Sequence, residues 1–221
     1  MLDLSFHSIL NKLLKTFFHL LYHPFAWAYD YIAAFVSLNR WKFWRVAALE
    51  YIHGSDILEL GFGTGHLQVE LIKHNFHAIG LDESWQMAEV ARKNILNNHL
   101  QPLLMCGVAQ FLPFSPKSLD GIIATFPSEY MMDNRTLLEL ERVLKPTGQI
   151  VIIPMAWLGG HSLQDSAARW LFKITGQTPE LTISFENKIS RLLNQVGFEV
   201  QIIKKTIQSD IVMIIIAEKY K

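Results

Sequence analysis

The sequence predicts an α/β protein with a doubly wound, mostly parallel sheet, a C-terminal antiparallel hairpin and an N-terminal helical cap. From residue 56 onward, short apolar runs alternate with helical segments, and this alternation is typical of crossover connections in a parallel sheet. A glycine-rich turn directly follows the first apolar run. Near the C-terminus two apolar runs are separated by only three residues, so these two strands are expected to pair antiparallel.

Each element follows from its local pattern. The parallel strands are expected at 56–60, 77–82, 102–106, 120–125 and 149–153. Helices fit residues 65–74, 84–97 and 134–144, and Ser84 and Asp133 are expected to cap the last two at their N-termini. A further helix at 185–196 ends at Gly197, and the hairpin strands follow within 198–206 and 210–219.

The chain is expected to divide into two parts. Residues 1–55 form the helical cap, and residues 56–221 form the main domain. A segment at 154–182 between the fifth strand and the last helix is expected to act as an apolar lid. Its large side chains are Trp157, Leu158, Trp170, Leu171 and Phe172.

Composition excludes several classes of protein. The 221 residues include 20 Lys and Arg and 20 Asp and Glu, so no overall positive charge would attract nucleic acid. The single cysteine, Cys106, cannot form an internal disulfide, which suits a reducing compartment and a cytoplasmic location. Among the nine histidines, the closest pairs lack Cys or carboxylate partners at a ligand spacing, so no metal site is expected.

The N-terminal segment is unusually apolar. Residues 17–38 contain His19, His23, Pro24 and Asp30, so we do not expect a transmembrane helix there. Between Phe6 and Leu21, large apolar residues recur at helical spacing. This stripe predicts either a helix packed on the core or a helix that places residues 1–21 in peripheral contact with a membrane.

The glycine turn carries the first functional signal. Residues 59–66 read Glu-Leu-Gly-Phe-Gly-Thr-Gly-His, and His66 stands where a dinucleotide fingerprint has its third glycine or alanine. A pyrophosphate would therefore fit poorly. Asp82, at the end of the second strand, can accept hydrogen bonds from both hydroxyls of a ribose. A ribose without a pyrophosphate suggests an adenosyl group that carries something other than phosphate.

The chain resembles the class I S-adenosylmethionine-dependent methyltransferases, which have a Rossmann-like fold. The resemblance runs through "LELGFGTGH", "IGLDES", "GVAQFLPFSPKSLDGIIATFP" and "ELERVLKPTGQIVII" in the family's order and spacing. It implies that S-adenosyl-L-methionine is the cofactor. It also implies that Glu59, Gly61, Gly63 and Gly65 hold the methionine part and that Asp82 holds the ribose.

The expected adenine site departs from the family pattern. The family often has Gly-Asp-Ala after the third strand, whereas this chain reads Gly107-Val108-Ala109-Gln110. Val108 cannot accept a hydrogen bond from the adenine amino group, so the Ala109 N–H and the Gln110 amide are the remaining polar groups. Weaker cofactor binding or a shifted adenine is expected. Thr125, at the end of the fourth strand, completes the expected cofactor site.

Residues 28–45, "AYDYIAAFVSLNRWKFWR", look like the segment that precedes the cofactor loop in quinone-biosynthesis C-methyltransferases and in enzymes acting on lipid-like molecules. This similarity implies that Tyr29 lies near the cofactor and that Phe25 and Trp27 lie near the acceptor. The alternative is that these aromatic residues only pack the cap onto the domain. The quinone enzymes' motif after the fourth strand is absent, because this chain reads "TFPSEYM" there.

The sequence thus predicts methyl transfer to a small apolar acceptor that is lipid-like, isoprenoid or aromatic. Alignment of donor and acceptor supplies much of the rate of such a displacement, and a base is needed only if the acceptor must lose a proton. Two other classes stay open. A cofactor-binding protein without catalysis would suit Val108, and a nicotinamide oxidoreductase is disfavoured by His66. The polar side chains expected to face the pocket are His66, Glu129, Tyr130, His161 and Tyr29.

Overall fold

A computed structural model of the chain describes residues 40–159 and 179–220. The amphipathic stripe, Tyr29 and most of the expected cap lie outside the described residues. So do His161 and the centre of the expected lid. No helix in the described ranges is long and apolar enough to cross a membrane.

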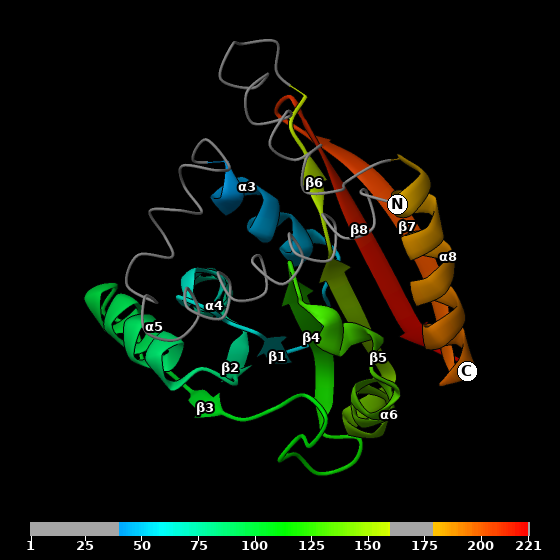
Figure 1. The fold of residues 1–221 in the computed structure, drawn as a ribbon. Helices are drawn as coiled ribbons and strands as arrows, with labels where there is room; N and C mark the ends of the chain where they lie inside the picture. Colours follow the sequence, from blue (N-terminus) through cyan, green and yellow to red (C-terminus); the bar gives the residue numbers. More distant parts are fainter. Residues whose placement is uncertain (1–39, 160–178, 221) are drawn as a thin grey trace, which may run out of the picture.

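Five parallel strands form the main part of the sheet in the order β3-β2-β1-β4-β5 (Figure 1). The chain runs outward from β1 to β3, returns across the sheet to β4 and continues to β5. The strand order therefore reverses between β1 and β4, and open α/β sheets bind ligands at the carboxyl ends of strands at such a point. The strands are β1 (Asp56–Leu60), β2 (His77–Asp82), β3 (Leu104–Cys106), β4 (Leu119–Thr125) and β5 (Leu144–Ile153).

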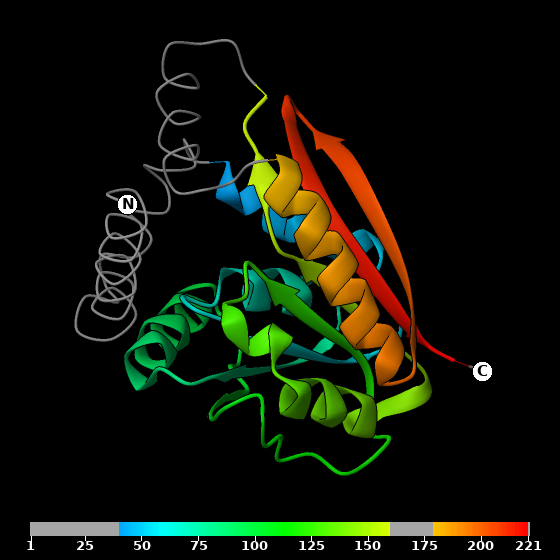
Figure 2. The same ribbon diagram turned by 45° about the vertical axis from the view of Figure 1, so that its right-hand side comes forward.

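The C-terminal hairpin is confirmed. Strands β7 (Phe198–Ile207) and β8 (Asp210–Lys219) pair antiparallel along their whole length (Figure 2). The other edge of β8 pairs antiparallel with β5 and with the two-residue strand β6 (Ala156–Trp157). The expected α/β fold with a mostly parallel sheet and an antiparallel C-terminal end is therefore correct.

Helices cover both faces of the sheet because successive side chains of a strand point to opposite faces. Ile57, Ile123 and Val151 pack in one core cluster with residues of α3 (Trp41–Val46), of the 3₁₀-helix η2 (Ala47–Glu50) and of α4 (His66–Lys73). Leu58, Ile122 and Ile152 pack in the other. That second cluster contains residues of the 3₁₀-helix η3 (Glu129–Met132), of α6 (Asn134–Val143) and of α8 (Pro179–Gln195).

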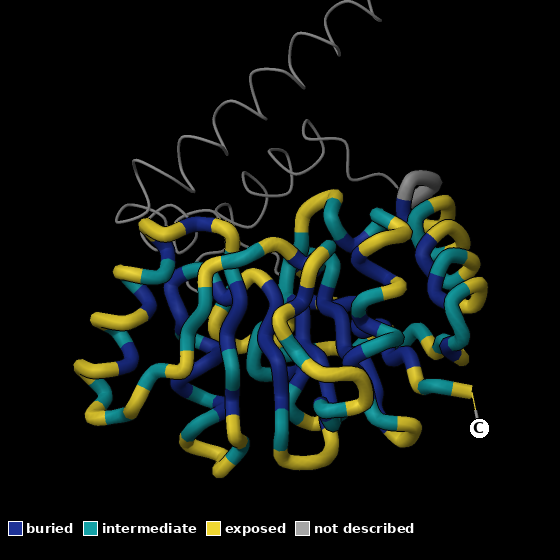
Figure 3. The backbone as a smooth tube through the Cα atoms, turned by 90° about the horizontal axis from the view of Figure 1, so that it is seen from below, coloured by how far each residue is buried: buried dark blue, intermediate teal, exposed yellow. Residues whose placement is uncertain are grey.

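Helix α5 (Trp85–Asn97) packs against α4, β2 and β3. Its N-cap is confirmed, because the Ser84 hydroxyl accepts a hydrogen bond from Met87 N at 3.2 Å. The Asp133 cap of α6 is confirmed in the same way by Arg135 N at 2.9 Å. Buried segments lie at the centre of the molecule and the turns at its periphery, as Figure 3 shows.

Several expected boundaries were wrong. Strand β3 begins at Leu104, two residues later than expected. Strand β5 begins at Leu144 rather than at Gln149. Leu144 pairs with Leu119 and Gln149 pairs with Gly121, so β5 has extra residues between these two pairs, and Pro146 and Gly148 lie in this irregular stretch. Helix α8 begins at Pro179 rather than at residue 185. A proline suits the first turn of a helix, where its missing N–H leaves no bond unmade.

Among the basic and aromatic residues at 40–45, Trp44 is buried in the core and Trp41 packs against it, whereas Lys42 and Phe43 are exposed. Trp44 is only 1% exposed, and its Nε1 donates to Asp210 Oδ2 at 3.0 Å. The Trp41 ring lies 4.0 Å from the Phe126 ring, centre to centre. Asp210 also accepts from Arg40 Nη1 at 2.7 Å and from Gly159 N at 3.2 Å. This one buried carboxylate therefore joins the hairpin turn to α3 and to the chain after β6.

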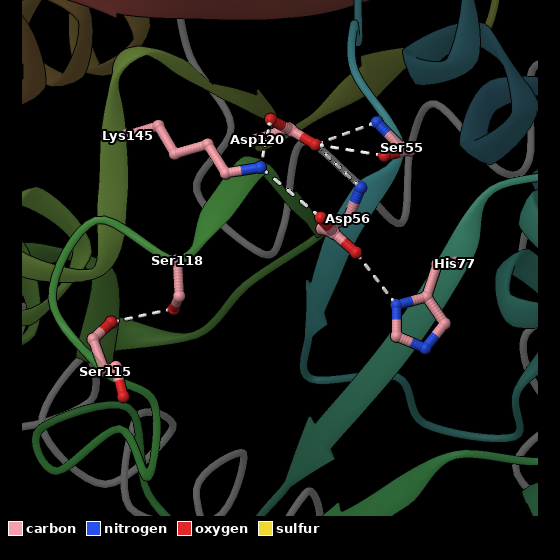
Figure 4. A network of polar contacts seen from close by, with 7 residues as sticks. All are labelled: Ser55, Asp56, His77, Ser115, Ser118, Asp120 and Lys145. Atoms are coloured by element: carbon pink, nitrogen blue, oxygen red, sulfur yellow. Dashed lines mark hydrogen bonds and ion pairs between the residues drawn. The ribbon is translucent and has the colours of Figure 1, made fainter.

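A polar network joins the amino ends of the parallel strands, at the edge of the sheet opposite the glycine turn (Figure 4). Asp120 Oδ2 accepts from Ser55 N and Asp56 N, each at 2.9 Å, and Lys145 Nζ donates to Asp120 Oδ1 at 2.7 Å. His77 Nδ1 lies 2.9 Å from Asp56 Oδ1. Burial alone would raise the pKa of the Asp120 carboxyl, but the hydrogen bonds from Asp56, Lys145 and Ser55 together hold it well below its usual range.

We predict that Asp120→Asn lowers the free energy of unfolding at pH 7 by about 2 kcal/mol, because the amide loses the charge that these donors stabilise. A carboxyl whose pKa is lower in the folded state stabilises the protein above its unfolded pKa, and this contribution is lost as the pH falls through the folded pKa. The variant should therefore lose less stability than the wild type below pH 4 in urea unfolding. Asp56→Asn, at a more exposed carboxyl of the same network, should have a smaller effect. Parallel acid profiles of the wild type and Asp120→Asn would contradict the prediction.

Candidate active site

The glycine turn after β1 has a backbone that other residues rarely adopt. Gly61, Gly63 and Gly65 have φ angles of +68°, +52° and +77°. In this left-handed region an L side chain is strained, and glycine is not. Gly61 N donates to Leu81 O at 2.8 Å, which keeps the turn beside the end of β2.

The three glycines have different neighbours. A Cβ on Gly65 would lie 2.7 Å from Ala91 Cβ, so this glycine lets the turn pack against α5. A Cβ on Gly61 would lie 3.1 Å from the Tyr130 hydroxyl. A Cβ on Gly63 would meet no atom of the described residues within 4 Å. Among these residues the backbone of Gly63 therefore borders open space, where a ligand can approach it closely.

Asp82, at the end of β2, is held by backbone donors from two turns. Gly63 N donates to Asp82 Oδ2 at 2.9 Å, and Ser84 N donates to Asp82 Oδ1 at 2.9 Å. Each carboxylate oxygen can accept a further hydrogen bond. The side chain is partly exposed, so a pair of ligand hydroxyls can reach it.

Glu59 lies beneath the glycine turn and is 2% exposed. Burial raises the pKa of its carboxyl to about 8, although a hydrogen bond with Gln68 and the charge of Arg45 act in the opposite direction. Within the described residues, Glu59 Oε2 and Gln68 Oε1 are buried acceptors without a donor. A neutral, protonated Glu59 avoids the cost of a buried charge, and a ligand cation would favour the carboxylate.

We predict that Glu59→Gln stabilises the protein at pH 8 by about 2 kcal/mol and has little effect at pH 5. Because the folded pKa lies above the unfolded value, the wild type should lose stability as the pH rises from about 5 to 8. The amide does not titrate, so it brings no buried charge at pH 8. Urea unfolding at both pH values measures the effect, with the exposed Glu89→Gln as the control. An equal change at the two pH values would show that Glu59 is charged in the folded protein.

The loop after β3 has little polar chemistry of its own. Val108 is 41% exposed, whereas Ala109 is buried in the core. Gln110 Nε2 donates to Asp133 Oδ2 at 3.2 Å, so its amide nitrogen supports the N-terminus of α6. The Gln110 oxygen and the Ala109 N–H are the groups left from the expected adenine site. Thr125 ends β4 and is partly exposed.

Helix η3 connects the glycine turn to a cavity. The Tyr130 hydroxyl donates to Leu60 O at 3.3 Å and thus lies directly over the start of the turn. Glu129, Met131 and Met132 of the same short helix line a cavity of about 750 Å³. The remaining lining residues lie just before η3, at and after the end of β5, and on one face of α8. They are Pro127, Ser128, Ile152, Pro154, Met155, Ser184, Phe185, Lys188 and Ile189.

The structure brings some of the expected site residues together and separates others. Gly61, Gly63, Asp82 and Tyr130 gather at the carboxyl ends of β1 and β2, and Glu129 lies next to them on η3. His66 instead lines a different cavity of about 780 Å³ between α3, α4 and the end of β7, and its Nδ1 lies 3.0 Å from Asn94 Nδ2. No group of three or more potential metal ligands occurs in the described part of the chain.

Sequence reasoning missed the α8 side of the cavity. Ser184, Phe185, Lys188 and Ile189 lie at positions i, i+1, i+4 and i+5 of α8 and share one face. Their spacing was visible in the sequence. That this face meets the end of β5 rather than solvent depends on the sheet topology, which the spacing alone does not give.

Part of the chain is similar to proteins of a known family. Residues 57–148 match the family described as "Methyltransferase domain". A demethylmenaquinone methyltransferase of Lactobacillus johnsonii is 29% identical over 90% of this chain and 91% of its own length. Another from Staphylococcus saprophyticus is 31% identical over 65% of this chain, which spans only 64% of that enzyme.

The fold agrees with solved structures. A Thermotoga maritima protein described as a SAM-dependent methyltransferase, possible histamine N-methyltransferase, superposes with a TM-score of 0.60. The match covers 91% of this chain and 99% of that one at 19% identity, so it shows the fold alone.

The described residues fit S-adenosylmethionine, the methyl donor of this family. Gly63 leaves its backbone open to a ligand, Asp82 can accept from ribose hydroxyls, and Glu59 Oε2 is a buried acceptor without a donor. Residues 57–148 thus match a methyltransferase domain, and the described residues have the Rossmann-like fold of S-adenosylmethionine-dependent methyltransferases.

Proposed function

We propose that the chain methylates a small apolar acceptor of aromatic or isoprenoid kind, and that this acceptor binds in the cavity between η3 and α8. One observation carries the proposal: the cavity lies at the carboxyl ends of β4 and β5, and its wall η3 also reaches the glycine turn through Tyr130. Met131, Met155 and Phe185 give it a soft apolar lining that suits ring systems and isoprenoid chains. The demethylmenaquinone acceptor named for the Lactobacillus relative is a compound of this kind.

Each residue of the proposed site has a separate task. S-adenosylmethionine supplies an electrophilic methyl group when bound. Asp82 and the backbone of Gly63 hold and orient the donor. Tyr130 keeps η3 against the glycine turn, so that the donor and the acceptor are held in a fixed position relative to each other. Glu129 lines the cavity and is our candidate for the group that accepts a proton from the acceptor.

The experiment fills the cavity without disturbing the core. Ser184 is exposed on α8 and lines the cavity, so Ser184→Trp should occupy acceptor space at little cost in stability. Its neighbour Ile183 is also exposed but does not line the cavity, so Ile183→Trp is the matched control. Turnover is measured as transfer of a labelled methyl group to demethylmenaquinone and to a panel of other apolar and polar acceptors.

We expect Ser184→Trp to lower kcat/KM for the acceptor at least tenfold and to leave S-adenosylmethionine binding unchanged, whereas Ile183→Trp should behave like the wild type. Equal turnover in both variants would place the acceptor elsewhere. Tight cofactor binding with no turnover on any acceptor would favour a binding protein without catalysis.

A further inference from the structure

We infer that Lys188 makes this methyltransferase select acceptors that carry an anionic oxygen, such as a phenolate, an enolate or a carboxylate, on an apolar body. The inference rests on the proposed function, because it concerns the same cavity. It adds a substrate class and a specificity-determining residue.

Lys188 lines the cavity from α8. It lies four residues after Ser184 and three after Phe185, on the face of α8 that lines the cavity. Lys188 is exposed while Ile189 beside it is buried. A lysine in such a position lays its aliphatic stem along the apolar wall and keeps its ammonium group at the rim.

The ammonium group of Lys188 has no protein partner in the described part of the chain: no hydrogen bond or ion pair involves it. By contrast, Lys204 on the neighbouring strand β7 is paired, since its Nζ lies 2.9 Å from Glu186 Oε1 of α8. Lys188 is also the one basic residue among the described residues that line this cavity. Its charge is therefore available to a ligand.

The second charge of the cavity fixes the direction in which such a ligand lies. Glu129 is the acidic residue of the described lining, and it comes from η3 rather than from α8. An anionic oxygen is repelled by Glu129 and attracted by Lys188, so it is held at the α8 side. The apolar body then lies against Met131, Met155 and Phe185, and a neutral hydroxyl or acidic C–H of the acceptor is left facing Glu129.

A matched pair of probes tests the inference without turnover. The anion 2-naphthoate and its neutral analogue 2-naphthamide have nearly the same shape, and isothermal titration into the full-length protein gives both dissociation constants. Lys188→Met removes the charge but keeps a long stem, and Lys188→Arg keeps the charge. Arg191→Met is the control, because Arg191 is exposed on the same helix and does not line the cavity.

We expect the wild type to bind 2-naphthoate about fivefold more tightly than 2-naphthamide, as befits an ion pair near the surface. Lys188→Met should abolish this preference, whereas Lys188→Arg and Arg191→Met should keep it. Equal binding of the two probes by the wild type, or a preference that survives in Lys188→Met, would overturn the inference and leave the proposed function intact. If neither probe binds, or if Ser184→Trp does not weaken their binding, the cavity is not the acceptor site and both proposals are wrong.

Discussion

Asp82→Ala is expected to weaken S-adenosylmethionine binding by at least a hundredfold and to abolish the rise in melting temperature that the cofactor causes. The carboxylate is expected to accept from both ribose hydroxyls, and removal of a charged acceptor of paired hydrogen bonds costs about 3 kcal/mol. The side chain also accepts from Gly63 N and Ser84 N, so the variant should distort the glycine turn as well. Isothermal titration with S-adenosylmethionine and with S-adenosylhomocysteine measures the loss directly.

The control is Glu89→Ala, which removes an exposed carboxylate from α5 away from the turn. It should bind the cofactor like the wild type. Circular dichroism and urea unfolding establish that Asp82→Ala is folded at the temperature of the titration. Wild-type affinity in a folded Asp82→Ala protein would show that the ribose lies elsewhere.

Asp210→Asn is expected to destabilise the protein by about 3 kcal/mol. Asp210 is fully buried and accepts from Trp44 Nε1, Arg40 Nη1 and Gly159 N. An asparagine of the same shape turns an NH₂ group toward at least one of these donors and leaves Arg40 without its counter-charge. Loss of one partner from a buried ion pair costs about 3–5 kcal/mol. Urea unfolding at pH 7 measures the difference.

Ser209→Ala is the control for Asp210→Asn, because Ser209 is exposed in the same turn and makes only long contacts with Arg40 and Asp210. We expect it to change stability by less than about 0.5 kcal/mol. Equal midpoints for the wild type and Asp210→Asn would mean that the three donors find other acceptors.

Much of the fold followed from local patterns in the sequence. The alternation of apolar runs and helical segments predicted the parallel strands. Ser84 and Asp133 cap helices α5 and α6, as expected for residues of these types. The start of β5 could not be predicted in this way, because Pro146 and Gly148 indicate a turn and only pairing with β4 brings Leu144 into the strand. Local patterns thus determine which elements form, and long-range pairing determines where they begin.

The residues of the candidate site also differ in whether the sequence alone could predict them. The glycines and Asp82 were predicted because a close backbone approach and a carboxylate at a strand end have local signatures. Lys188 carries no such signature, since an exposed lysine on an amphipathic helix usually faces only water. The cavity that Lys188 lines arises where η3, the end of β5 and α8 meet, and these elements are far apart in the sequence.

The short helix η3 belongs to both halves of the proposed site, and this has a thermodynamic consequence. Tyr130 holds η3 to the backbone of the glycine turn, while Glu129 and Met131 form part of the acceptor cavity. A donor that moves the turn then changes the free energy of acceptor binding. By reciprocity the acceptor changes the affinity for the donor by the same factor. One turn of 3₁₀-helix can therefore couple the binding of the two substrates.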